Sequence, residues 1–148
     1  MNELNADIIY HVLAPTCSLS VIYKTLDRFL PERKSLNLDY ADNPNGNGFT
    51  SEQEMISHFV DSDHSGQTFY WNAKVLDARA PMVGMDITAD KKLIVTITAK
   101  TPDDNIEEYF QDLRTFLDSD VGVISYYGLA DYSNGRDFER KYDLEPCS

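Results

Sequence analysis

Basic residues are scarce in this 148-residue sequence, which has 13 Lys and Arg against 25 Asp and Glu and a formal net charge of −12. A surface of that sign repels phosphate groups, so we expect neither nucleic acid nor an anionic membrane as a partner. Long apolar runs are also missing, because no stretch approaches the roughly 20 residues that span a bilayer. The opening Met-Asn-Glu-Leu lacks the basic start and apolar run of a signal peptide. We therefore expect a cytoplasmic protein.

Cysteine is nearly absent, with Cys17 and Cys147 far apart in the chain. Two distant cysteines form neither a disulfide framework nor a zinc site, so we predict free thiols. Cys17 precedes the first predicted helix, where the helix dipole can lower a thiol pKa. The alternative to the inert thiol that we expect is a nucleophile paired with a distant histidine.

Motifs for common catalytic chemistry are missing as well. Gly46-Asn-Gly48 begins the pattern G-x-G-x-x-G, but Ser51 takes the place of the third glycine. The sequence has no G-x-S-x-G elbow and no H-E-x-x-H pair. We predict no catalytic residue and no cofactor.

What is present is a folding composition, 42% hydrophobic and 11% aromatic, in a length that suits one domain over residues 1–148. Apolar alternation predicts strands at 6–13, 68–76, 83–88, 93–99 and 121–127. Helices are predicted from Ser18 to Pro31, from the capping box Ser51-Glu-Gln-Glu54, and from Thr101-Pro102. Residues 31–50 are predicted to form a mobile loop and residues 128–148 a polar tail.

The order β-α-α-β-β-β-α-β predicts an α+β fold with a mixed or antiparallel sheet and helices packed on it. The first and third helices have apolar stripes of equal spacing, which suggests a ferredoxin-like arrangement with additions. Equal spacing is also what any helix with one buried face shows. The polar tail is compatible with a short surface helix.

The negative charge gathers in two blocks, residues 36–66 with six acids and no Lys or Arg, and residues 101–120 with seven acids and Arg114 alone. Such blocks can be solvated faces, or they can steer a basic partner. Tyr70 alternates out of phase with Trp71 and is a candidate for an exposed contact. The partner-binding residues that we predict are Asp104, Glu107, Glu108, Asp112, Asp39, Asp42, Glu52 and Tyr70.

Asp61-Ser-Asp63-His-Ser65-Gly66 matches the first half of a calcium-binding loop. The twelfth position is Asn72 where the loop needs a bidentate Glu, and a strand is predicted there. We therefore expect a polar turn and no metal site, with a calcium-responsive module as an alternative. His58 and His64 lie beside these acids, but their spacing is not diagnostic of zinc.

Three segments resemble the small immunity proteins of bacterial polymorphic-toxin and contact-dependent inhibition systems. They are Tyr70-Trp71-Asn72, the hairpin Met85-Asp-Ile-Thr-Ala-Asp-Lys-Lys-Leu-Ile-Val95, and Phe116-Leu-Asp-Ser-Asp-Val-Gly-Val-Ile-Ser-Tyr126. The resemblance covers residues 68–127 and transfers no functional residue. It implies a cytoplasmic protein that binds one toxin tightly and performs no chemistry, and such toxins are often nucleases with basic channels. The alternative is a small enzyme or ligand-binding domain of unknown substrate.

Overall fold

The computed structural model describes residues 8–38, 48–62, 66–74, 82–99, 106–126 and 128–144. Within them the order of elements is the predicted β-α-α-β-β-β-α-β, followed by one further helix. The bounds are β1 Ile8–Leu13, α1 Leu19–Phe29, α2 Glu52–Asp61, β2 Gln67–Asn72, β3 Met82–Ile87, β4 Leu93–Ala99, α3 Ile106–Leu117, β5 Gly122–Tyr126 and α4 Gly135–Tyr142.

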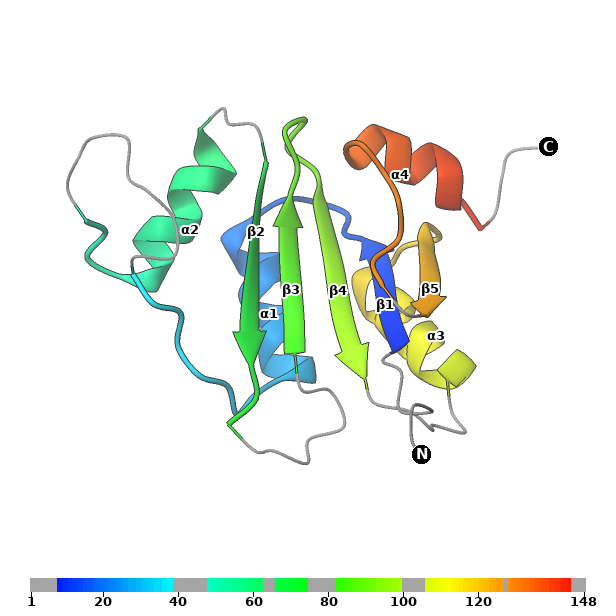
Figure 1. Ribbon diagram of the computed structural model, residues 1–148, viewed down its shortest axis with the longest axis horizontal. Coiled ribbons are helices and arrows are strands. Elements are labelled where there is room, and N and C mark those ends of the chain that lie inside the picture. Colours follow the sequence, from blue (N-terminus) through cyan, green and yellow to red (C-terminus); the bar gives the residue numbers. More distant parts are fainter. Residues whose placement is uncertain are drawn as a thin grey trace.

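The five strands form one antiparallel sheet in the order β2-β3-β4-β1-β5 (Figure 1). β1 and β3 both pair with β4, so they run parallel to each other with β4 between them. β4 and β5 are related in the same way across β1. The chain thus contains two interlocked split β-α-β units, which is the ferredoxin-like topology. The additions are α2 and β2, inserted before β3, and α4 after β5.

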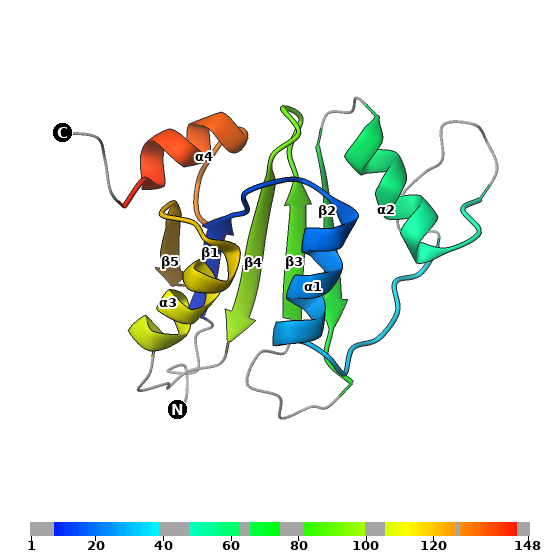
Figure 2. The same ribbon diagram turned by 180° about the vertical axis from the view of Figure 1, so that it is seen from behind.

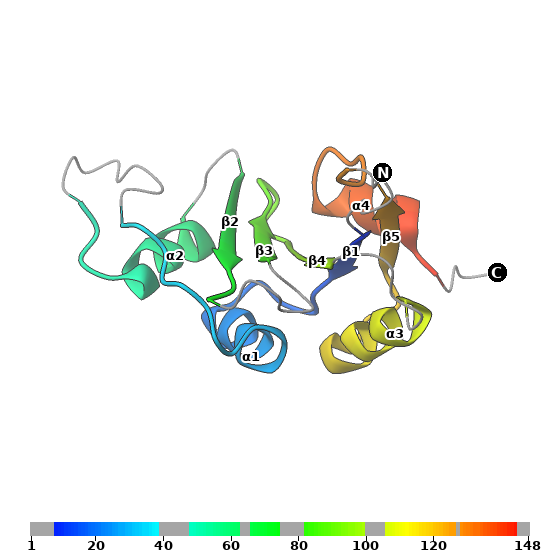
Figure 3. The ribbon, with the colours of Figure 1, turned by 60° about the horizontal axis from the view of Figure 1, so that its bottom comes forward.

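One face of the sheet supports the main hydrophobic core, and α1 and α3 lie on that face (Figures 2 and 3). The strand side chains alternate, so every second residue of β1, Ile8, Tyr10 and Val12, points into this core. The helices contribute the predicted stripes, with Ile22 and Leu26 fully buried from α1 and Phe110, Leu113 and Leu117 buried from α3. The amphipathic spacing in the sequence therefore identified the buried faces of both helices.

The predicted helix starts follow from local capping chemistry. Ser18 and Ser51 are the N-caps of α1 and α2, and each side-chain oxygen accepts a hydrogen bond from the backbone N–H three residues later. The Glu54 carboxylate closes the capping box one residue earlier than expected, on the Thr50 N–H at 2.6 Å. Residues 101–105, which include the predicted start of the third helix and the predicted contact Asp104, lie outside the described residues.

The opposite face of the sheet is covered in part by α4 (Figure 3). Phe138 of α4 is fully buried in a second cluster with Leu13 and Ile94, against which Tyr132 and Tyr142 pack. The segment predicted as a polar tail therefore contains a helix that is docked on the sheet. Its apolar contact is made by Phe138 and by the partly buried Tyr142, which a composition average does not reveal.

Candidate protein-interaction surface

The outer face of α3 is acidic, as its sequence predicts. Glu107, Glu108, Gln111 and Asp112 are all exposed, while Phe110 and Leu113 on the other side are buried. No ion pair joins Glu107 or Glu108 to any residue that the structure describes. Acids in the first helical turn also favour the positive end of the helix dipole. These two carboxylates are thus free to interact with cations outside the chain.

Asp112 has a second role, because it holds α3 to α1. The Arg28 Nη2 nitrogen donates to both Asp112 oxygens, at 2.9 and 3.1 Å, in a contact between two exposed side chains. Beneath this bridge Phe29 contacts Phe116 edge-on at 5.6 Å between ring centroids. Phe116 keeps 39% of its surface exposed. The α1–α3 seam therefore presents an aromatic ring beside carboxylates.

The other acidic block, residues 36–66, is only partly described, since Asp39, Asp42 and Asp63 lie outside the described residues. Glu52 does, however, have a clear position. Its carboxylate accepts hydrogen bonds from the Tyr23 hydroxyl at 2.7 Å, the Leu36 N–H at 2.8 Å and the Trp71 indole N–H at 3.2 Å. Burial and the hydrogen bond to Glu52 raise the pKa of Tyr23. Glu52 thus joins α1, α2 and β2 inside the fold, and its role in partner binding stays a prediction.

Tyr70 lies on the face of the sheet away from the main core and is half-buried. It pairs across the strands with Gly84, and a Cβ on that glycine would meet the Tyr70 ring at 2.7 Å. The glycine therefore leaves the space that the ring occupies. Tyr70 is less exposed than its sequence position suggested, and its contact with a partner is also still a prediction.

The thiol of Cys17 is half-buried at the edge of a groove of about 390 Å³ between the β3–β4 hairpin and the start of β5. Burial raises its pKa to about 11, while Lys91 lowers it slightly and Asp61 raises it. A thiol with that pKa is protonated near neutral pH and is a poor nucleophile. The alternative of a reactive cysteine is therefore not favoured. Cys147 lies outside the described residues.

The calcium-like segment begins where α2 ends. Asp61 is the last residue of the helix and Ser62 its C-cap, while residues 63–65, including His64, fall in an undescribed gap. Residues Gln67–Asn72 then form β2, with Asn72 opposite Met82. The second half of the calcium pattern is therefore a paired strand, as predicted, and not a loop that could close around an ion.

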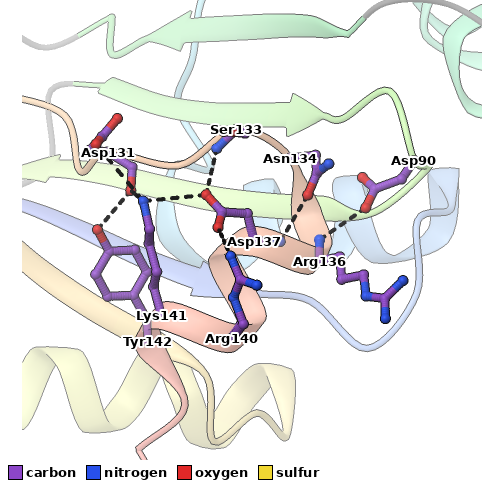
Figure 4. A network of polar contacts seen from close by, with 9 residues as sticks. All are labelled: Asp90, Asp131, Ser133, Asn134, Arg136, Asp137, Arg140, Lys141 and Tyr142. Carbon is purple, nitrogen blue, oxygen red and sulfur yellow. Dashed lines mark hydrogen bonds and ion pairs between the residues drawn. The ribbon is translucent and has the colours of Figure 1, made fainter.

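A polar network that the sequence did not reveal fixes the start of α4 (Figure 4). Both oxygens of Asp90, in the β3–β4 hairpin, accept hydrogen bonds from the N–H groups of Gly135 and Arg136 at 2.9 Å. Asn134 caps the Asp137 N–H at 2.8 Å, and the Asp137 carboxylate accepts from the Ser133 N–H at 2.8 Å. Although burial opposes it, these backbone N–H groups and the Thr88 hydroxyl lower the pKa of Asp90. The helix is thus capped partly by a residue 45 positions earlier.

The same region forms a shallow groove of about 740 Å³ along α4. Arg140 and Lys141 both contact the Asp137 carboxylate, at 2.9 and 3.3 Å, so the basic end of the helix is neutralised from within the helix. These side chains are occupied in structural contacts. The α3 face therefore remains the better candidate for an external partner.

Comparison with protein-family models, with curated proteins and with solved structures gives no match. No helix among the described residues has both the length and the apolar character needed to cross a membrane. Within that same part of the chain, no group of three or more His, Cys, Asp or Glu side chains is placed to hold a metal ion.

Proposed function

We propose that this chain is a non-catalytic protein that binds and neutralises a basic protein partner. The resemblance to small immunity proteins makes a toxin domain the first partner to test. The observation that supports it best is the outer face of α3, where Glu107 and Glu108 are exposed without a described cationic partner. The net charge of −12 adds a long-range field of the same sign.

The charge and the aromatic seam have different roles in this proposal. Exposed carboxylates raise the rate at which a basic partner arrives, and contribute less to the final affinity. A tight complex also needs a ring that loses its contact with water on binding. Phe116, with 39% of its surface exposed beside the Arg28–Asp112 bridge, is placed to supply it.

The test starts with identification of the partner by affinity capture from the source cells and mass spectrometry. The purified partner is then measured against the wild type and the double variant Glu107→Lys, Glu108→Lys. We expect association at low salt to slow about 3- to 10-fold in the variant, with the difference closing as salt screens the charges. Asp112 is left unchanged, because its replacement would also break the contact with Arg28.

A matched control is the double variant Glu32→Lys, Asp61→Lys, which makes the same change in charge on two exposed residues, one beside the end of β2 and the other at the end of α2. If the control slows association and the α3 variant does not, the α2 side of the molecule is the docking surface. Absence of any basic protein partner would refute the proposed function itself.

A further inference from the structure

The edge strand β5 has backbone groups directed away from the sheet. It pairs with β1 on one side and is last in the strand order. The Leu13 N–H donates to the Val121 carbonyl oxygen at 3.0 Å, which fixes the phase of the ladder. In an antiparallel pair alternate residues bond to the neighbouring strand. Val123 and Ser125 therefore bond to β1, while the N–H and C=O groups of Gly122, Ile124 and Tyr126 point outwards.

Each edge of the sheet has one isolated bridge just outside its edge strand. At the end of β2, the chain at Arg33 forms a bridge with Ala73, and the Lys34 N–H donates to the Asn72 carbonyl oxygen at 2.8 Å. At β5, the bridge between Val121 and Asp143 covers only the residue before the strand. From 122 to 126, no described residue pairs with the outer side of the backbone.

β5 also lacks two of the features that protect an edge strand. Exposed edges commonly carry charged residues or proline, which discourage the addition of another strand. Gly122-Val-Ile-Ser-Tyr126 has neither, and Tyr126 leaves 52% of its surface exposed. An edge of this kind is suited to accept an extended segment through main-chain hydrogen bonds.

Charge indicates which segment fits. Asp118 and Asp120, just before β5, and Asp143, opposite Val121, are exposed carboxylates at one end of the edge. Arg114 offsets part of this charge through Asp120, at 3.5 Å. A second copy of the chain would bring another net charge of −12 to the same place, so self-pairing of β5 is disfavoured.

We propose that β5 binds an extended, basic segment of a protein partner as an added strand. Outward backbone groups of Gly122, Ile124 and Tyr126 pair with that segment, a cationic side chain lies near Asp118 and Asp120, and an apolar side chain packs on Tyr126. This inference rests on the proposed function, because it names the main-chain contact through which the same basic partner would dock.

Amide hydrogen exchange of the free protein, followed by NMR, tests the geometry first. The amides of Gly122, Ile124 and Tyr126 should exchange fast, while those of Val123 and Ser125 should be protected by β1. Slow exchange at all five would show that the edge is already covered and would overturn the proposal. Protection that grows with protein concentration would identify a second copy as the occupant and would overturn it as well.

Binding is tested with a blocked synthetic peptide of alternating Val and Lys, and with the same peptide carrying Glu in place of Lys. The basic peptide should slow exchange at the three outward amides, with saturable shifts confined to β5 and its flanks, and should bind more weakly as salt rises. The acidic peptide should not bind. Equal binding of both peptides, or shifts elsewhere, would contradict the proposal.

Ile124→Pro removes one outward N–H, and proline is tolerated in an edge strand where the N–H faces solvent. Ile124→Val is the matched control, since it trims the side chain but keeps the N–H. We expect the proline variant to bind the basic peptide about fivefold more weakly than the valine variant. If proline prevents folding, the exchange data on the wild type still decide whether β5 accepts an added strand.

The two proposals can fail separately. If a basic partner binds and responds to Glu107→Lys, Glu108→Lys while the β5 amides are unchanged, the edge is refuted and the function stands. If the peptide protects β5 but no basic protein partner exists, the function fails and the edge remains a strand-binding site.

Discussion

At the scale of single residues, His11 lies on the face of β1 that α4 covers and links this strand to the chain after β5. It is fully buried, and its Nε2 accepts a hydrogen bond from the Ala130 N–H at 3.2 Å. An accepting Nε2 requires the neutral ring with its proton on Nδ1. Burial lowers the pKa of His11 from 6.5 to about 4, against a smaller opposite effect of backbone groups at Ile9 and Val123.

This shift predicts a loss of stability in mild acid. The unfolded chain binds a proton at His11 below about pH 6.5, whereas the folded chain binds it only near pH 4. The contribution of His11 to the free energy of unfolding should therefore be complete above pH 6.5 and be lost as the pH drops towards 4, by at most about 3 kcal/mol. Urea unfolding at pH 7.5, 6 and 5 measures it.

His11→Gln is the control, because glutamine keeps an acceptor but does not titrate in this range. Its stability should be lower at pH 7.5 and flatter with pH. If the variant and the wild type show the same slope between pH 7.5 and 5, His11 is not the group responsible.

At the scale of elements, α4 shows where the sequence was insufficient. α1 and α3 were predicted from apolar stripes that fill one helical face, such as Ile22 and Leu26. α4 buries Phe138 as its only large apolar residue, and Asp90 completes its cap from a distant hairpin. Gly135 lies so close to Lys92 that an added Cβ would meet its side chain at 2.2 Å. No local pattern encodes contacts of this separation.

The docking of α4 should depend on both of these contacts, to different degrees. Phe138→Ala removes a fully buried ring and should cost about 3–5 kcal/mol of stability. Asp90→Ala removes the capping carboxylate and should cost about 1 kcal/mol. Urea unfolding gives both values, and exchange at Phe138 and Glu139 amides reports whether α4 opens on its own. Glu139→Ala, on the exposed side, is the control and should be nearly neutral. Equal losses for Phe138→Ala and the control would mean that α4 adds little to the fold.

At the scale of the whole molecule, the order of elements and the α+β class were predictable because alternation and helical periodicity are strong in this sequence. The equal apolar stripes suggested the ferredoxin-like core, but the edge position of β2 and the inward turn of Glu52 were not predictable, because they depend on contacts between distant segments such as Trp71 and Tyr23. The candidate surface on α3 could be predicted only in part from the sequence. Glu107 and Glu108 followed from the helical stripe of α3, but the use of Asp112 by Arg28 required the positions of two helices.

The net charge of −12 predicts that added NaCl raises the thermal stability of the folded protein. Each ion pair among the described residues, such as Arg28–Asp112, has at least one exposed partner and is worth little, so screening it costs little. Repulsion among the excess carboxylates opposes the compact state, and salt shortens its range from about 10 Å at 0.1 M to about 3 Å at 1 M. Thermal unfolding between these concentrations should show a rise of roughly 2–4 °C in Tm.

The double variant Glu107→Lys, Glu108→Lys distinguishes screening of charge repulsion from stabilisation by salt that is excluded from the protein surface. It changes the net charge by +4, from −12 to −8, without touching a described ion pair. The variant should be at least as stable as the wild type at low salt, because less repulsion remains, and its Tm should respond less to NaCl. Sodium sulfate would stabilise both chains equally if exclusion from the surface were the cause. A Tm that falls with NaCl in the wild type would instead mean that its exposed ion pairs stabilise the fold more than its charge repulsion destabilises it. The acidic faces would then serve the stability of the fold and not the binding of a partner.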